Sequence, residues 1–332
     1  MMNDFWTKKK VLITGAGGFI GSQLVERLVG AGASVRAFVH YNSRADPGLL
    51  RLASPETTSR VEIVAGDLRD SETVHKAVAG CTYIFHLGAL ISIPYSYLHP
   101  MEVAETNFMG TLNVLMACRD LNVGRLIHTS TSEVYGTALH TPIDETHPLQ
   151  GQSPYSASKI GADKLAESFY CTYQLPVVTV RPFNTYGPRQ SGRAVIPTII
   201  TQALTNCRIT LGSLEAVRDF TYVDDTINGF LCAAEADNVE GCTFNLGTGT
   251  EISIGSLAEK IIQKVGNPNQ IQVNPTRLRP TRSEVMRLLS DNSLARTRLG
   301  WEPAVSLDEG LDRTIQWIGE NLDRYRIGVY EF

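Results

Sequence analysis

The stretch VLITGAGGFIG, residues 11–21, decides the fold of this 332-residue chain. Its first four residues form the short apolar run of a buried strand, and glycines then stand at Gly15, Gly18 and Gly21. Apolar side chains recur at helical spacing over residues 20–31. A tight turn alone would also explain the glycines. Strand, glycine-rich turn and helix together predict a pyrophosphate at the helix N-terminus, where free N–H groups and the helix dipole favour an anion.

Apolar strand-like runs alternate with helical patterns through roughly the first 180 residues. This alternation predicts a parallel sheet with helices on both faces, an α/β fold of the Rossmann-type, doubly wound kind. One intervening helix is expected over residues 102–121. The strands after the first are expected at residues 34–39, 61–65, 83–87, 125–130 and 177–181.

Prolines and glycines crowd the chain after Arg181, and the regular alternation ends there. We expect a smaller mixed α/β lobe for the substrate, formed by residues 182–220 and 251–332. The dinucleotide-binding domain then comprises residues 1–181 plus about 221–250, which return to the main sheet. Helices of the lobe are expected near residues 194–205, 256–265 and 307–323.

Two further segments, TSTSEVYG at 129–136 and YSASK at 155–159, carry reactive side chains. Tyr155 and Lys159 stand four apart, so on a helix they share one face. A Lys ammonium beside a phenol lowers the pKa of the phenol from its usual value near ~10. Tyr155 is therefore a candidate general base for a sugar hydroxyl. Glu133 is either a second base or a solvated loop carboxylate.

Composition and charge restrict the possible partners. The chain is 43% hydrophobic and 19% charged, as in proteins with a substantial core. A formal charge of -4 gives no general attraction to nucleic acid or an anionic membrane. No apolar run approaches the ~20 residues of a membrane span, and the run after the basic N-terminus is too short for a signal peptide. These features predict a cytoplasmic protein.

The six cysteines are scattered and show neither a CxxC pair nor metal-ligand spacing. In a chain of this size we interpret them as reduced thiols, and we expect no disulfide framework and no metal site. They are Cys81, Cys118, Cys171, Cys207, Cys232 and Cys242.

Together these segments resemble the extended short-chain dehydrogenase/reductase family that acts on nucleotide sugars, over nearly the whole chain. Thr-Ser-Glu before Val-Tyr-Gly is similar to the 4,6-dehydratases of that family. The stretches at 89–97 and 279–285 look most like dehydratases acting on GDP-N-acetylglucosamine in bacterial legionaminic acid synthesis. Other matching motifs are GDL at 66–68, HLGA at 86–89, RPFNTYGPR at 181–189, RDFTYVDD at 218–225 and LGW at 299–301.

The resemblance implies NAD or NADP as the cofactor. The second strand usually ends in an acid that binds the adenosine ribose and favours NAD, but Val39 stands there. Without that carboxylate NADP is tolerated, and His40 or Arg44 would approach its 2′-phosphate; His40 is equally explained as a surface residue. Asp67 either binds the adenine amino group or caps a helix starting near residue 71. The implied cofactor contacts are Gly15, Gly18, Phe19, Ile20, Gly21, His40, Asp67, Leu68, Leu87, Ala89, Tyr155 and Lys159.

The resemblance also implies a redox-neutral loss of water. Tyr155 takes the proton of the carbon-4 hydroxyl, helped by Thr131 and Lys159, while hydride passes to the nicotinamide. Glu133 then abstracts the carbon-5 proton, water leaves carbon 6, and the hydride returns there. Many related dehydratases carry an Asp where Ser132 stands, and that Asp protonates the departing hydroxyl. With Ser132 in its place, Glu133 is left to serve as both base and acid.

A nucleotide-sugar substrate needs local cationic groups. Arg218 and Arg279 match family positions that clamp the diphosphate, and a guanidinium suits phosphate bidentately. Asn184 would either bind a sugar or phosphate oxygen or stabilise the turn in which it lies. The remaining candidates for binding the anion are Arg189, Arg193 and Arg282. Ser92 and Tyr95 are candidates for the sugar pocket, although core packing would also explain these two residues.

Family members commonly form homodimers through a four-helix bundle, which implies residues 102–121 and 156–173 here. Three other functions compete with the dehydratase. A UDP-sugar 4-epimerase would need no carboxylate at 133, and a UDP-glucuronate decarboxylase would need a group that recognises the substrate carboxylate. A non-catalytic dinucleotide sensor would be expected to lack part of the Thr131, Tyr155 and Lys159 set.

Overall fold

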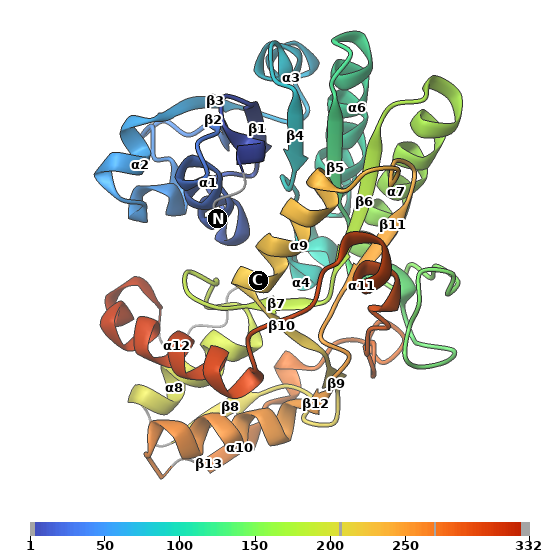
Figure 1. Cartoon of the computed structure of the whole chain (residues 1–332). Coiled ribbons are helices and arrows are strands. Elements are labelled where there is room, and N and C mark those ends of the chain that lie inside the picture. The colour runs from blue at the N-terminus through green and yellow to red at the C-terminus, as the bar shows by residue number, and fades with distance from the viewer. Residues whose placement is uncertain (1–3, 206–207, 269, 327–332) are drawn as a thin grey trace.

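The computed structural model describes residues 4–205, 208–268 and 270–326. Its centre is a seven-stranded sheet in which every neighbouring pair is parallel, with helices on both faces (Figure 1). The strands are β1 (Lys10–Thr14), β2 (Ser34–His40), β3 (Val61–Gly66), β4 (Tyr83–His86), β5 (Arg125–Thr129), β6 (Val177–Pro182) and β11 (Thr243–Leu246). Their order is β11-β6-β5-β4-β1-β2-β3. The chain thus winds outward from β1 in both directions, which confirms the predicted doubly wound fold.

The central strands are nearly continuous apolar runs because helices bury both of their faces. In β1, Val11, Leu12 and Ile13 are completely buried. The edge strand β3 differs, since Ile63 is 46% exposed. Parallel strands bring all their carboxyl ends to one edge of the sheet. The loops after β1, β3, β4 and β5 therefore meet there.

Helices are found where apolar spacing predicted them, with one correction. The expected continuous helix over residues 102–121 is interrupted by a π-helical segment, η3 (Glu105–Met109). The buried Asn107 amide in this segment bonds both the N–H and the C=O of Leu90, which holds the irregular turn. The helices are α1 (Phe19–Gly30), α2 (Pro55–Ser59), α3 (Ser71–Val78), α4 (Ile93–Leu98), α5 (Pro100–Ala104), α6 (Gly110–Asp120), α7 (Pro154–Tyr173), α8 (Val195–Thr205), α9 (Val223–Glu235), α10 (Ile254–Val265), α11 (Ser293–Leu299) and α12 (Leu307–Glu320).

The chain after β6 forms three two-stranded sheets beside the main one. The expected helices of this region are present as α8, α10 and α12. The return to the main sheet is also confirmed, because β11 pairs with β6 in parallel. The small sheets pair β7 (Asn184–Tyr186) with β10 (Phe220–Tyr222), β9 (Val217–Arg218) with β12 (Ile252–Ser253), and β8 (Arg208–Leu211) with β13 (Gln270–Val273).

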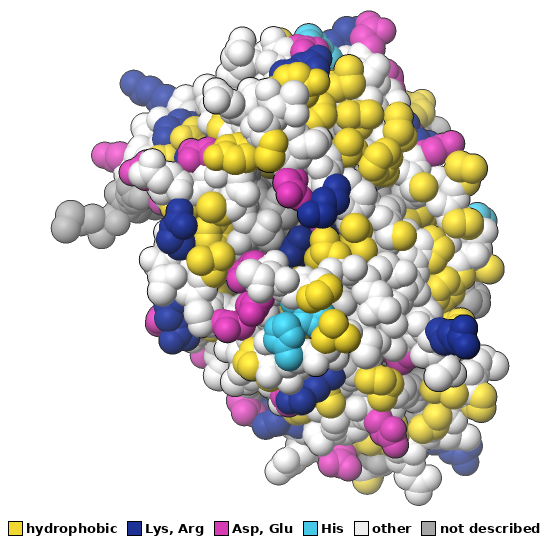
Figure 2. All heavy atoms as spheres, turned by 90° about the vertical axis from the view of Figure 1, so that its right-hand side faces the viewer, with side chains coloured by type: hydrophobic (Ala, Val, Ile, Leu, Met, Phe, Trp, Pro, Cys, Tyr) yellow, Lys and Arg dark blue, Asp and Glu magenta, His cyan; other side chains and the backbone are white. Residues whose placement is uncertain are grey.

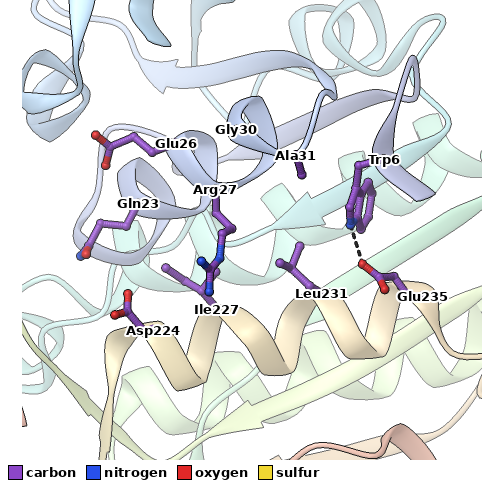
Figure 3. A pocket seen from close by; sticks show the side chains of 10 residues that line it. All are labelled: Trp6, Gln23, Glu26, Arg27, Gly30, Ala31, Asp224, Ile227, Leu231 and Glu235. Atoms are coloured by element: carbon purple, nitrogen blue, oxygen red, sulfur yellow. Dashed lines mark hydrogen bonds between the residues drawn. The ribbon is translucent and has the colours of Figure 1, made fainter. Parts of the chain in front are cut away.

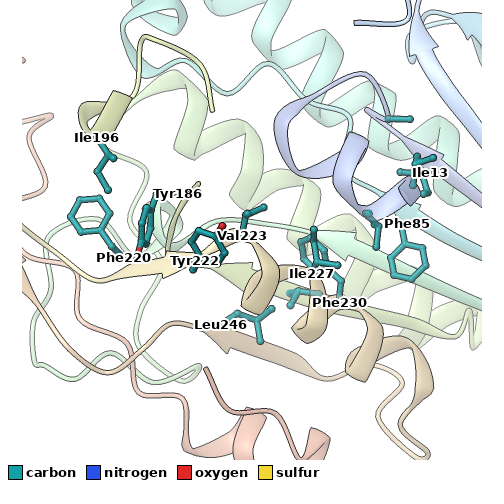
Figure 4. Close-up of a cluster of buried hydrophobic side chains, with 14 of the residues drawn as sticks. Ile13, Phe85, Tyr186, Ile196, Phe220, Tyr222, Val223, Ile227, Phe230 and Leu246 are labelled. Carbon is teal, nitrogen blue, oxygen red and sulfur yellow. The ribbon is translucent and has the colours of Figure 1, made fainter. Parts of the chain in front are cut away.

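One hydrophobic core joins the main sheet to the later part of the chain. Figure 4 shows it running from Ile13 and Phe85 past Phe230 on α9 to Tyr186 and Phe220. Burying a side chain of this size contributes roughly 1.5–3 kcal/mol. This shared packing fixes the position of the later part of the chain relative to the main sheet.

Five cysteines, at positions 81, 118, 171, 232 and 242, are free thiols, while Cys207 lies outside the described residues. Within the described ranges, no helix has the length and apolar character needed to span a bilayer. The same ranges contain no cluster of three His, Cys, Asp or Glu side chains arranged to hold a metal.

Candidate active site

The glycine-rich turn after β1 is closely packed against the loop after β4. Gly15 has a φ of +70°, and a Cβ there would lie 2.8 Å from the Gly88 nitrogen. A Cβ on Gly21 would come within 2.2 Å of the Gly15 oxygen. Gly18 is the N-cap of α1, and no side chain caps the helix. The uncapped N–H groups and the helix dipole therefore fit a dinucleotide pyrophosphate.

The other cofactor residues predicted around this turn contribute mainly backbone atoms and apolar side chains that pack beneath or beside it. Phe19 and Ile20 begin α1, and their side chains pack against the core. Leu68 is buried directly beneath Gly88, 2.7 Å from where a Cβ would stand. Leu87 and Ala89, which follow β4, are half-buried beside the turn.

At the adenosine end, Val39 is buried and carries no polar group. His40, the last residue of β2, is exposed. Asp67 accepts hydrogen bonds from Arg69 at 2.6 to 3.1 Å, and these lower its pKa. The alternative that Asp67 caps α3 is wrong, since Asp70 accepts from the first N–H groups of that helix.

Tyr155 and Lys159 lie one turn apart on α7, which Ser153 starts with a capping box. Both are buried, with only 6% and 4% of their surfaces exposed. The Thr131 side chain, at the end of β5, hydrogen-bonds Tyr155, and the Glu133 charge acts on Tyr155 as well. The fold therefore assembles these four predicted residues at the carboxyl edge of the sheet.

The electrostatics of Tyr155 correct the sequence-based expectation. Burial raises the pKa of Tyr155, and the Glu133 and Asp163 charges add to this, while the Thr131 hydrogen bond opposes it. The Lys159 Nζ instead donates to the Thr129 carbonyl oxygen at 2.6 Å. Burial lowers the pKa of Lys159 to about 8, although Asp163 opposes the change. The helical spacing was right, but desolvation, which favours the neutral phenol, is the largest influence on the pKa of Tyr155.

Glu133 lies in the short 3-10 turn η4 (Ser132–Tyr135), whose N-cap is Thr131. The Thr131 hydroxyl accepts from the Glu133 N–H at 3.3 Å. Glu133 is half-buried, whereas Ser132 is only 3% exposed. The Glu133 charge contributes to the pKa shifts of both Tyr155 and Arg218, so the carboxylate lies near these two side chains.

Two predicted anion-binding arginines meet at one carboxylate. An Arg218 Nη2 lies 3.3 Å from Glu284 Oε1, and the Arg279 Nη1 lies 3.7 Å from the same oxygen. That Arg279 nitrogen is buried and has no hydrogen-bond partner. Burial lowers the pKa of Arg218, while Glu133 and Glu284 oppose the change. Two guanidinium groups that lie beside the same Glu284 oxygen, the buried one of Arg218 and the half-buried one of Arg279 with its unpaired nitrogen, fit a diphosphate.

Arg189 is not part of this group. Its guanidinium bonds both carboxylate oxygens of Glu26 on α1, at 2.7 and 3.1 Å. The prediction of a substrate contact is therefore replaced by a structural role, in which Arg189 ties the loop after β7 to α1. Arg193 and Arg282 are exposed.

Three other predicted substrate residues already have protein partners. Ser92 caps α4 by accepting from the Tyr95 N–H, and the Tyr95 hydroxyl donates to Glu102 at 2.6 Å. The Asn184 side chain donates to the Asp219 carbonyl at 3.3 Å. These contacts fix the local turns, and Ser92 and Asn184 remain half-buried.

One contact, between α4 and residue 283, was not predicted from the sequence. The Tyr97 hydroxyl on α4 lies 2.7 Å from Ser283 Oγ, which donates to the Gln152 carbonyl at 2.7 Å. Tyr97 and Ser283 are separated by 186 positions in the chain, so no local pattern could have paired them.

A cavity of about 550 Å³ lies elsewhere, between α1 and α9 (Figure 3). Arg27 points into it among Ile227, Leu231 and the Trp6–Glu235 hydrogen-bonded pair. None of the predicted catalytic or substrate residues lines this cavity.

Fold and site together define a nucleotide-sugar enzyme of the extended short-chain dehydrogenase/reductase class. The chain matches the model of the GDP-mannose 4,6 dehydratase family over residues 12–314, and it belongs to that family. A UDP-glucose 4-epimerase from Mycolicibacterium smegmatis is 36% identical over 93% of this chain and 98% of its own length. A dTDP-glucose 4,6-dehydratase from Streptomyces antibioticus is 32% identical over 94% of this chain and 92% of its own.

The chain is also similar to a solved structure of this kind. DesIV, a dTDP-glucose 4,6-dehydratase from Streptomyces venezuelae solved with NAD bound, superposes with a TM-score of 0.84 at 30% identity. The similarity covers 96% of this chain and 99% of DesIV. Because relatives of this kind include both epimerases and dehydratases, family membership establishes a sugar-nucleotide enzyme with a dinucleotide-binding fold and leaves the reaction open.

Proposed function

We propose that the protein is a sugar-nucleotide 4,6-dehydratase, a lyase that converts GDP- or UDP-N-acetylglucosamine to its 4-keto-6-deoxy product. Glu133 carries this proposal. It is a half-buried carboxylate at the start of η4, and its charge affects the pKa of both Tyr155 and Arg218. An epimerase needs only one proton-transfer centre at carbon 4, whereas a dehydratase needs a second base for carbon 5.

Each side chain has a distinct task in this proposal. Tyr155 and Thr131 bind the carbon-4 oxygen, and Tyr155, in its phenolate form, accepts the proton of the carbon-4 hydroxyl as the hydride leaves. Lys159 holds positive charge next to the buried Tyr155 hydroxyl. A bound nicotinamide supplies the hydride acceptor for carbon 4 and later the donor for carbon 6. Glu133 takes the carbon-5 proton of the 4-keto sugar and protonates the departing carbon-6 hydroxyl, because Ser132 is no acid.

We assign the cofactor to residues 1–181 and about 221–250, and the substrate to the lobe of 182–220 and 251–332. The diphosphate is held by Arg218 and Arg279. The orphaned Arg279 nitrogen supports this assignment, because a buried donor without a partner costs free energy until an acceptor arrives.

Donor specificity provides the test. UDP-, GDP- and dTDP-linked glucose, together with UDP- and GDP-linked N-acetylglucosamine, mannose and glucuronate, would be incubated with the protein and the products weighed by mass spectrometry. Loss of one water from an N-acetylglucosamine donor is the expected result. Water loss only from another donor would support the dehydratase reaction but contradict the proposed N-acetylglucosamine substrate. Loss of carbon dioxide from glucuronate would instead identify a decarboxylase.

A UDP-sugar 4-epimerase is the second candidate, favoured by the 36% identity to the mycobacterial UDP-glucose 4-epimerase. This function would use Tyr155 and Lys159 and leave Glu133 without a chemical task. It predicts a product of unchanged mass and altered stereochemistry at carbon 4.

We propose that NAD is the usual cofactor and that NADP is tolerated. No carboxylate stands at the end of β2 to repel a 2′-phosphate, since Val39 is buried and His40 is exposed. Calorimetry should give dissociation constants for the two cofactors within about tenfold, or 1.4 kcal/mol. His40→Asp should weaken NADP and spare NAD. A wild-type protein that binds NAD and ignores NADP would contradict this.

We further propose a homodimer through the face carrying α6 and α7. Figure 2 shows apolar side chains gathered on this side of the molecule. Met101 in α5, Met109 in η3 and Met116 in α6, three elements that contact α7, are 72%, 44% and 39% exposed. Contiguous exposed apolar patches mark interaction sites. Charged residues in such a patch oppose association because their desolvation is costly.

The double variant Met109→Glu with Met116→Glu should therefore sediment as a monomer, against a wild-type dimer. Met286→Glu is the matched control, because Met286 is 42% exposed outside this face. A double variant that remains dimeric would place the interface elsewhere.

A further inference from the structure

A buried polar network lies directly behind the catalytic side chains. Its centre is Asp163, which is only 5% exposed and lies on α7, one turn beyond Lys159. The Asp163 carboxylate accepts from His128 Nε2 at 3.0 Å, Ser130 Oγ at 2.8 Å, and Arg181 Nε and Nη2 at 3.2 and 3.0 Å. Burial favours the neutral acid, but the His128 hydrogen bond and the Arg181 charge outweigh it and lower the pKa of Asp163. Asp163 is therefore a buried carboxylate.

Arg181 extends this network to the segment that carries Glu133. Its Nη1 donates to the Tyr135 hydroxyl at 2.9 Å, and the guanidinium carbon lies 5.0 Å from the Tyr135 ring centroid. The Tyr135 hydroxyl in turn donates to Asn245 Oδ1 at 2.7 Å. Tyr135 belongs to η4, two residues beyond Glu133, so its position and that of Glu133 are linked through one short turn.

One guanidinium is thus bonded to both segments that carry reactive groups. Its Nε and Nη2 are bonded to α7, which bears Tyr155 and Lys159, and its Nη1 is bonded to η4, which bears Glu133. Arg181 is itself only 5% exposed, and its strand β6 lies between β5 and β11. Its planar fork has the geometry for several simultaneous bonds in fixed directions, which a Lys ammonium cannot reproduce.

We propose that Arg181 is a positioning residue that sets the spacing between the Tyr155–Lys159 pair and Glu133. This rests on the proposed dehydratase function, in which both sets of groups act on one sugar ring. Tyr155 acts at carbon 4 and Glu133 at carbon 5, so the two must reach adjacent atoms in succession. Misplacement of a reacting group by about 1 Å can cost on the order of a hundredfold in rate.

Tyr135→Phe is the sharpest test, because it keeps the ring beside Arg181 and removes only the hydroxyl joined to Arg181 and Asn245. Single-turnover experiments would follow sugar oxidation by the absorbance of reduced nicotinamide and water loss by mass spectrometry of quenched samples. Tyr135→Phe should slow water loss at least about tenfold relative to oxidation. Reduced nicotinamide should then accumulate, while the substrate KM stays near the wild-type value.

Arg181→Lys should slow both oxidation and water loss, because it disturbs both segments. Tyr186→Phe is the matched control: Tyr186 is 1% exposed, and its hydroxyl donates to the Leu307 carbonyl at 3.3 Å away from the network. This control should leave the ratio of the two rates unchanged. Melting temperatures of all variants would show whether each variant is folded at the temperature of the rate measurements.

The outcomes separate this inference from the dehydratase assignment. Variants that melt earlier but keep the wild-type rates and their ratio would make Arg181 a purely structural residue and overturn the proposal. A wild-type protein that releases no water from any donor would overturn the dehydratase assignment instead. In that case the effect of Arg181→Lys on sugar oxidation decides whether Arg181 positions Tyr155 and Lys159: slower oxidation supports it, and an unchanged rate overturns it.

Discussion

Glu133→Gln should abolish water loss while the protein still binds its cofactor and oxidises the sugar at carbon 4. Glutamine preserves the size of the side chain and its place in η4 but cannot accept the carbon-5 proton. General-base catalysis contributes roughly 10²–10⁴-fold to a rate, and water loss should fall by that order. In deuterated water, the wild-type product should carry deuterium at carbon 5, and the variant should show none of this exchange.

Glu72→Gln serves as the control, because Glu72 is an exposed carboxylate of the same size, paired with Lys76 on the outside of α3. It should leave water loss and cofactor binding at wild-type values. A Glu133→Gln protein that still released water at the normal rate would show that Glu133 is not the base. The Glu133 carboxylate would then have only an electrostatic effect on Arg218.

Lys159→Met should eliminate activity without lowering stability at pH 7. The pKa of about 8 for the buried Lys159 lies roughly two units below that of a free lysine. At about 1.4 kcal/mol per unit, keeping this side chain charged costs the fold about 3 kcal/mol. Methionine removes that cost and loses the hydrogen bond to the Thr129 carbonyl, which is worth about 1 kcal/mol. Urea unfolding at pH 7 checks the balance.

The stability difference between Lys159→Met and the wild type should depend on pH. The folded-state pKa of Lys159 is lowered, so the unfolded chain holds the proton more tightly than the folded protein does. The penalty is fully present below about pH 8 and disappears as the pH rises towards the unfolded pKa near ~10.4. The stability advantage of Lys159→Met should therefore shrink between pH 7 and pH ~10.

Lys164→Met, which removes an exposed ammonium from the same helix, should show no such trend. A Lys159→Met protein that is less stable than wild type by the same amount at both pH values would mean that desolvation of Lys159 is not the dominant contribution.

Local sequence patterns were sufficient for six strands of the main sheet, β1 to β6, and for the helices α8, α10 and α12. The apolar run before Gly15 predicted β1, and the later runs predicted the strands that follow, because strand and helix periodicity are properties of neighbouring residues. The pairing of Tyr155 with Lys159 followed from helical spacing alone. The interruption of the helix at Asn107 could not be predicted, because it depends on the Leu90 backbone, 17 residues away.

The sequence by itself determined the parallel sheet, the glycine-rich turn, and which reactive side chains stand at strand ends. Only the tertiary structure decided their electrostatics and partners. Tyr155 has a raised pKa because the surrounding fold buries it, Arg189 bonds Glu26 on α1, and Arg181 joins α7 to η4. Desolvation and buried hydrogen bonds depend on segments brought together from distant parts of the chain, whereas strand and helix periodicity depends on neighbours along it.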